Sequence, residues 1–232
     1  AFALAGLAGF FALTALKADI GSTVASWAYG KQAETSDRIL LATIAAMPHE
    51  RHYQRQRSFN LLGLALDEIK RSSTAENYPR IRGLLDQAED QARDSLRSFP
   101  ADPWIVLVVA NVMQMRALPA IRPFAAEDGR KAALEADELF NRAYEIFPNQ
   151  PLLLRNWAQL RFNEGDNWGA FRLLDRMEDT IPNEVEPYAE RVIMAKQIND
   201  MDTVNETIER ARQRLDENGI QRLLAVAGIQ QK

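Results

Sequence analysis

The chain has 232 residues, enough for one or two domains with a buried core. It carries 28 basic and 32 acidic residues, and residues 117–232 hold 15 of the basic and 20 of the acidic ones. This acidic balance argues against nucleic acid as the main partner, because phosphate binding needs a basic face. The absence of cysteine excludes disulfides, thiolate metal sites and thiol nucleophiles. With only 11 Gly and 10 Pro, the composition favours an ordered, helix-rich protein.

The chain begins with an apolar run. Thr14 is the only polar side chain in residues 1–16, and Lys17 and Asp19 end the run. A helix of this length is about 24 Å long, shorter than the roughly 30 Å hydrocarbon core of a bilayer. We interpret residues 1–16 as the end of a transmembrane helix that anchors the protein. An uncleaved signal peptide and a buried soluble helix are the two alternatives.

After residue 17, amphipathic segments are separated by prolines with a regular period. Pro148 and Pro182 lie 34 residues apart, and the residues 12, 8 and 5 positions before each are small, large and small or flexible. Similar triplets precede Pro48, Pro100 and Asp216. Small residues let neighbouring helices approach closely, and proline ends a helix. The five triplets are Ser36, Leu40 and Thr43; Ala88, Ala92 and Ser95; Ala136, Phe140 and Ala143; Ala170, Leu174 and Met177; Val204, Ile208 and Ala211.

This pattern resembles the tetratricopeptide repeat (TPR) family over residues 17–217. The resemblance implies an all-α fold, a right-handed solenoid of about five helix pairs, and residues 218–232 are expected to form a C-terminal capping helix. The apolar segment 103–118 is predicted to be a helix, because it is too long for a strand and its neighbours are helical. Inserted loops are expected at 72–79 and 119–129. The predicted pairs are 18–30 with 34–47, 50–70 with 77–98, 103–118 with 130–147, 151–164 with 167–181, and 186–199 with 202–217.

The order of features near the start of the chain is similar to the C-terminal region of O-antigen ligase and polymerase type membrane proteins. The similarity covers about residues 10–70, including the segment Leu16-Lys17-Ala18-Asp19-Ile20 after the apolar run. In that family the last transmembrane helix leads into an extracytoplasmic TPR array, and glycosyl transfer belongs to the polytopic membrane part. The resemblance therefore offers an alternative interpretation as the C-terminal domain of a ligase-like glycosyltransferase, and it implies no catalytic residue in this chain.

No group of residues predicts catalysis, a metal site or a cofactor. His49 and His52, the only histidines, share a helical face but lack a third ligand nearby, so we interpret them as a solvated helix start. The basic stretch of Arg51, Arg55 and Arg57 could contact lipid phosphates or an anionic glycan, but such charges more often serve the solubility of a long amphipathic helix, and we favour that interpretation. The four tryptophans are predicted to be packing residues; they are Trp27, Trp104, Trp157 and Trp168.

The TPR resemblance implies a protein-interaction module, since such arrays tend to bind partners along the concave face lined by the first helix of each pair. We therefore predict a non-catalytic scaffold without a cofactor, tethered to a membrane on its extracytoplasmic side. An arginine beside an aromatic residue is a typical interface anchor. The predicted partner-binding residues are Arg57, Asn60, Arg155, Gln159 and Phe162.

Overall fold

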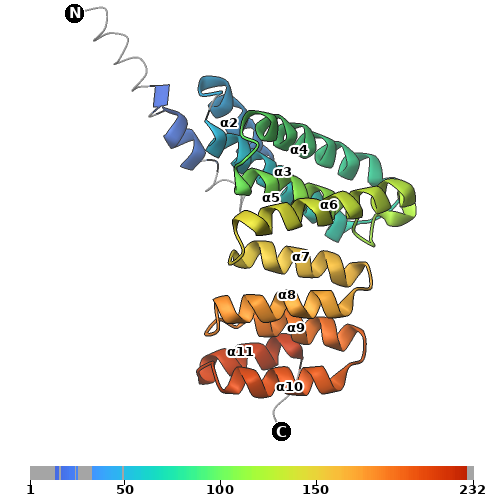
Figure 1. Cartoon of the computed structure of the whole chain (residues 1–232). Coiled ribbons are helices and arrows are strands. Elements are labelled where there is room, and N and C mark those ends of the chain that lie inside the picture. The colour runs from blue at the N-terminus through green and yellow to red at the C-terminus, as the bar shows by residue number, and fades with distance from the viewer. Residues whose placement is uncertain (1–13, 16, 24, 26–32, 49, 229–232) are drawn as a thin grey trace, which may run out of the picture. The chain divides into compact units, whose positions relative to one another are not determined.

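The computed structural model describes residues 14–15, 17–23, 25, 33–48 and 50–228, and those ranges contain helices and turns but no strand. The chain divides into two compact units, residues 1–136 and 137–232. Figure 1 labels the helices in chain order. The prediction of an all-α fold is confirmed for the described part of the chain.

The first unit contains a short helical stretch at residues 17–23, followed by longer helices. These are α2 (Ala33–Ala46), α3 (Arg51–Arg71), α4 (Tyr78–Ser98), α5 (Pro103–Arg116), the 3-10 helix η1 (Arg122–Phe124) and the start of α6 (Ala126–Ile146). The helix α3 packs against α2, α4 and α5. Residues 17–23 also contact α3, because Ser22 Oγ donates to Gln56 Oε1 over 2.6 Å and Tyr53 Oη donates to Asp19 Oδ1 over 2.5 Å.

The second unit continues from the rest of α6 through five more helices. These are α7 (Pro151–Asn163), α8 (Asn167–Thr180), α9 (Glu186–Gln197), α10 (Met201–Arg212) and α11 (Glu217–Ala227). Each pair packs internally, α7 with α8 and α9 with α10, and α9 also packs against α7 and α11. The first helix of one pair therefore contacts the first helix of the next, which is the expected arrangement of repeated helix pairs.

The repeat triplets occupy the helix contacts. All fifteen predicted positions are at most 7% exposed, and Ala136, Phe140 and Ala143 are fully buried. The same offsets before each helix end place these residues on one face of α2, α4, α6, α8 and α10. The period found in the sequence is therefore the register of the packed helices.

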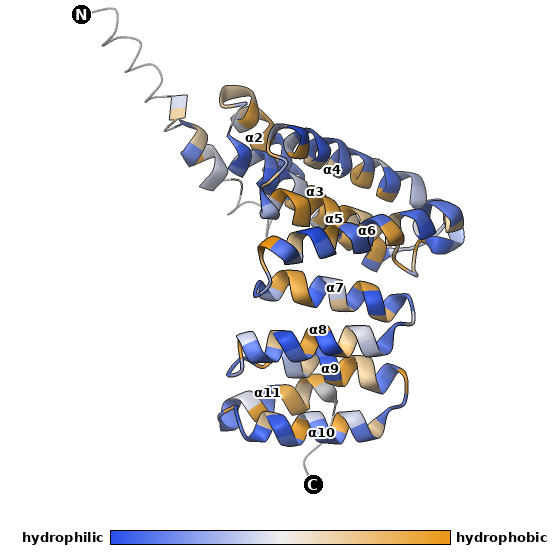
Figure 2. Ribbon diagram, in the orientation of Figure 1, coloured by the Kyte–Doolittle hydropathy of each residue, from blue (hydrophilic) through white to orange (hydrophobic). Residues whose placement is uncertain are grey.

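The apolar segment 103–118 forms the helix α5, as predicted. Residues 105–113 are all buried, and Figure 2 shows α5 with apolar residues around most of its surface, unlike α4 or α10. Asp102 caps this helix, since its Oδ1 accepts from Trp104 N over 2.9 Å, and Pro103 is its first residue.

The predicted loop 119–129 ends earlier than expected. The helix α6 begins at Ala126, four residues before the predicted start, and Gly129 N donates to Ala125 O over 2.8 Å. Glu127 and Asp128 in its first turn are favourable at the positive end of a helix. The two inserted loops meet within the first unit, where Tyr78 stacks on Phe124 with 5.4 Å between ring centres.

The predicted membrane anchor falls mostly outside the described residues, which exclude residues 1–13 and 16. None of the helices in the described ranges combines the length and apolar character needed to cross a bilayer. Anchoring through residues 1–16 therefore stays a prediction. In the predicted capping segment, α11 covers Glu217–Ala227, and residues 229–232 lie outside the described part.

Candidate functional site

Three of the predicted partner-binding residues lie together in the second unit. Arg155, Gln159 and Phe162 are spaced by four and three residues, so they share one side of α7. The Arg155 guanidinium forms an ion pair with Glu186 at the start of α9. Gln159 Nε2 donates to Asn163 Oδ1 over 3.0 Å, and Phe162 is half-buried. Two neighbouring first helices thus contribute one surface, which we call the α7–α9 face: Arg155, Gln159, Phe162, Glu186 and Glu190.

The α7–α9 face contains a carboxyl group in an unfavourable environment. Desolvation by burial raises the pKa of Glu190, the nearby Arg155 guanidinium acts in the opposite direction, and the Glu186 carboxylate adds to the rise. Burial is the largest of these effects, so the carboxylate is poorly solvated. A donor brought by a partner would therefore interact strongly with it.

The two predicted residues of the first unit are largely enclosed by its helices. The side chain of Arg57 is 12% exposed, its Nε donates to Asp37 Oδ1 over 3.0 Å, and its Nη1 donates to Gln91 Oε1 over 3.2 Å. Asn60 is 5% exposed. Arg57 therefore connects α3 to α2 and α4, and a role for these two residues in partner binding remains a prediction.

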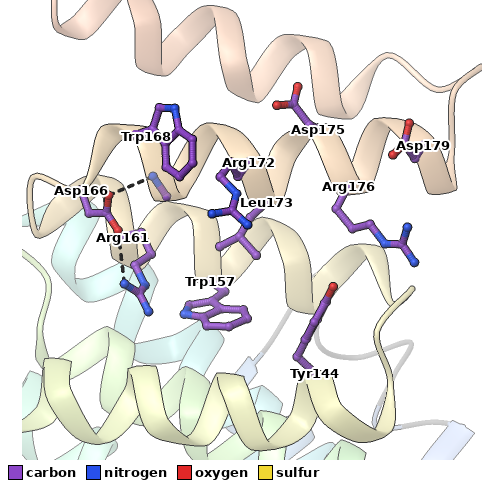
Figure 3. Close-up of a pocket in the computed structure, with 11 residues that line it drawn as sticks. Tyr144, Trp157, Arg161, Asp166, Trp168, Arg172, Leu173, Asp175, Arg176 and Asp179 are labelled. Carbon is purple, nitrogen blue, oxygen red and sulfur yellow. Dashed lines mark hydrogen bonds and ion pairs between the residues drawn. The ribbon is translucent and has the colours of Figure 1, made fainter.

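An open groove of about 580 Å³ lies on another side of the second unit (Figure 3). We call it the α8 groove and define it by Tyr144 of α6, Trp157 and Arg161 of α7, and Trp168, Arg172 and Arg176 of α8. Successive helix residues are rotated by about 100°, so Trp157 and Arg161 lie on the side of α7 opposite to Arg155. The α8 groove and the α7–α9 face are therefore separate surfaces of the same unit.

The floor of the α8 groove is held by a network around Trp157. Its Nε1 donates to Asp137 Oδ1 over 2.7 Å, and its ring lies 5.7 Å from Tyr144 and 6.5 Å from Phe140 between ring centres. Arg161 pairs with the same Asp137 over 2.7 Å, with its guanidinium 5.6 Å from the Trp157 ring centre. These contacts fix the aromatic floor in one position.

The prediction that all four tryptophans pack in the interior is wrong for Trp168. Trp157 is 8% exposed, as expected, but Trp168 is 68% exposed. Trp168 follows the turn at Gly165 and lies in the first turn of α8, on the side away from the buried Ala170 and Leu174. Trp104 is half-buried, and Trp27 falls outside the described residues.

Two arginines beside Trp168 face the groove without a carboxylate partner in the described part of the chain. The Arg172 guanidinium lies 4.6 Å from the centre of the Trp168 ring. Arg176 Nη2 donates to Asn149 Oδ1, an uncharged acceptor, over 2.7 Å. The neighbouring Asp166 is engaged by Arg161 over 3.2 Å.

The described ranges contain no group of three His, Asp or Glu side chains arranged to hold a metal ion. His49 lies outside those ranges. His52 is exposed, and its Nδ1 is 3.3 Å from Arg55 Nη2. The α7–α9 face and the α8 groove are the surfaces of the second unit considered as candidate sites.

The geometry defines a class of protein, an array of helix pairs in which the first helices of consecutive pairs contact each other. The crystal structure of TTC0263, a thermophilic TPR protein of Thermus thermophilus, is similar with a TM-score of 0.68 and 11% identity, covering 91% of this chain and 100% of that one. A MamA RS-1 ArsTM double mutant is similar with a TM-score of 0.56 and 12% identity, covering 89% of this chain and 95% of that one. The fold is therefore TPR-like. No family model and no curated protein matches the chain.

Proposed function

We infer that this protein is a non-catalytic scaffold that binds a protein partner through the α7–α9 face. The observation that carries this function is the placement of Arg155, Gln159 and Phe162 on one side of α7, where Arg155 meets Glu186 and Glu190 of α9. The Arg155–Glu186 ion pair is partly exposed, so charged groups of a partner can compete for either side chain. The half-buried Phe162, two turns along the same side of α7 as Arg155, adds the desolvated area typical of interface anchors.

The TPR-like fold supports the same function, since the TPR resemblance implies interaction through the first helices of the pairs. We extend the proposal to a membrane tether at residues 1–16 with the helix pairs on the extracytoplasmic side. Its support is the apolar run that ends at Lys17. The comparisons do not support the alternative of an O-antigen ligase-like glycosyltransferase domain.

Site-specific photo-crosslinking tests the partner surface. A photoreactive amino acid is placed at position 159 on the α7–α9 face and, as a matched control, at position 222 on the exposed side of α11. We expect position 159 to give a discrete crosslinked protein that position 222 does not give. The double variant Arg155→Glu, Phe162→Ala should abolish that product while thermal melting stays nearly unchanged. Equal crosslinking from both positions, or an unchanged product in the double variant, would show that the partner binds another surface.

A further inference from the structure

The side chains of Trp168, Arg172 and Arg176 form a line along α8. They are spaced by four residues, which places them one above another on a single side of the helix. Figure 3 shows Arg172 and Arg176 extending into the space beside α7, where Tyr144 directs its hydroxyl group. Trp168 stands at one end of this line with most of its surface open to solvent.

The line is positively charged on an acidic unit. Residues 137–232 contain 12 basic and 17 acidic side chains. Asp175 and Asp179 also line the groove, but Asp175 pairs with Arg191 and with Arg210, the latter over 3.1 Å. Within the described residues neither Arg172 nor Arg176 forms an ion pair with these carboxylates, so both charges are available to an acidic ligand.

The spacing of the line matches an extended peptide. Four residues of an α-helix advance by about 6 Å. Two residues of an extended chain advance by about 6.6 to 6.8 Å and return the side chain to the same face. Alternate side chains of an extended segment can therefore meet Trp168, Arg172 and Arg176 in turn.

We propose that the α8 groove binds an extended acidic segment of a partner protein. An apolar side chain of the segment packs on Trp168, and acidic residues two and four positions away pair with Arg172 and Arg176. Because Arg172 already rests on the Trp168 ring, its guanidinium is held in place before the segment arrives. This surface lies on the side of α7 opposite to Arg155, so it is independent of the proposed α7–α9 interface.

Selection from a random peptide library displayed on phage tests the proposal directly. The protein is immobilised, and sequences that also bind the variant Trp168→Ala, Arg172→Glu are removed. We expect the enriched peptides to carry one apolar residue followed or preceded by acidic residues at alternate positions. Absence of enrichment, or enriched peptides that are neutral or basic, would overturn the proposal.

The consensus peptide is then titrated by fluorescence anisotropy. Trp168→Ala and the pair Arg172→Glu, Arg176→Glu should each weaken binding by roughly tenfold or more. Arg222→Glu, at an exposed arginine on α11, and Arg155→Glu on the α7–α9 face should leave binding unchanged. Equal weakening by Arg155→Glu would show that the peptide occupies the α7–α9 face instead.

A charge exchange distinguishes direct contact from an indirect effect. The Arg172→Glu, Arg176→Glu variant should bind a version of the peptide in which the acidic residues are replaced by lysine. Binding of the acidic peptide to the unsubstituted protein should also weaken as salt is raised from about 0.05 M to about 0.5 M, because salt screens charge pairs. Failure of the exchanged pair to bind, or Trp168-dependent binding of heparin in place of the acidic peptide, would reject the peptide as occupant.

Discussion

Glu190 carries a carboxyl group whose ionised form is destabilised by burial on α9. Its pKa is raised in the folded protein, mainly by desolvation, so the unfolded chain releases this proton at lower pH than the folded chain. Between those two pKa values the folded state binds more protons, and the free energy of unfolding falls as pH rises. Above the folded-state pKa the full penalty of the buried charge remains.

Replacing Glu190 by glutamine should therefore raise the melting temperature at pH 7 and have no such benefit at a pH below the ordinary glutamate range. Thermal melting across this pH range checks the result, with Glu184→Gln at an exposed position as the control. A lower melting temperature of Glu190→Gln at pH 7 would mean that attraction to Arg155 outweighs desolvation.

Ala143 tests the repeat register at a single position. It is fully buried in α6, where the sequence places a small residue five positions before Pro148. A larger side chain must displace a neighbouring helix, so Ala143→Leu should cost about 1–3 kcal/mol in the free energy of unfolding. Ala225→Leu on the exposed side of α11 should change it by no more than about 0.5 kcal/mol. Equal effects in chemical denaturation would contradict the packing described for Ala143.

The burial of Ala143 could be predicted from sequence, whereas the surroundings of Arg57 and Trp168 could not. Small residues recur at a fixed offset because neighbouring helices approach closely at the same place in every repeat. The hydrogen bonds of Arg57 depend on Asp37 and Gln91, which come from two other helices. The register of the triplet Ala170, Leu174 and Met177 indicates that Trp168 faces away from the core, but the side chains around it come from the packing of other helices. The four-residue spacing of Trp168, Arg172 and Arg176 is the one feature of the sequence that indicates a shared surface on α8.

At the scale of the helix, the start of α5 depends on one side chain with two roles. Asp102 Oδ1 accepts from Trp104 N over 2.9 Å, while its Oδ2 lies 2.9 Å from Arg51 Nη1. The first contact satisfies a helix-terminal donor, and the second connects α5 to the start of α3.

Asp102→Ala removes both contacts and should cost about 0.5–2 kcal/mol in the free energy of unfolding. Asp102→Asn keeps an oxygen that can cap the helix and should cost less. Arg51→Ala should have the smallest effect, because its side chain is 57% exposed and exposed ion pairs contribute little. Chemical denaturation of the three variants gives the order. If Arg51→Ala matched Asp102→Ala, the ion pair and not the cap would hold this junction.

The start of α6 shows where sequence rules for helix ends stop being sufficient. No proline or typical capping residue stands at Ala125, and Gly129 favoured a loop. In the structure Gly129 is buried, and a Cβ atom there would lie 3.3 Å from Arg122 Cγ. The missing side chain of Gly129 lets the 3-10 helix pack closely against α6, and the glycine does not form a turn. Such a contact between non-adjacent residues has no local signature.

Across the whole molecule, the proposed anchor can be separated from the helix pairs by truncation. Contacts between the start of the chain and α3 include those of Asp19, which accepts from Tyr53 Oη, and of Ser22, which donates to Gln56. Ala18 and Ala25 are buried in the same stretch. A cut after residue 16 therefore spares these contacts, and a cut after residue 25 removes them.

Deletion of residues 1–16 should release the protein from membranes and leave the melting temperature of the helix pairs unchanged, because each repeat is stabilised by its neighbours. Deletion of residues 1–25 should release it equally but lower the melting temperature, since it uncovers the side of α3 that carries Tyr53 and Gln56. Membrane fractionation and circular dichroism measure the two effects. If the shorter deletion already unfolds the first unit, residues 1–16 belong to its core, and the proposed anchor is wrong.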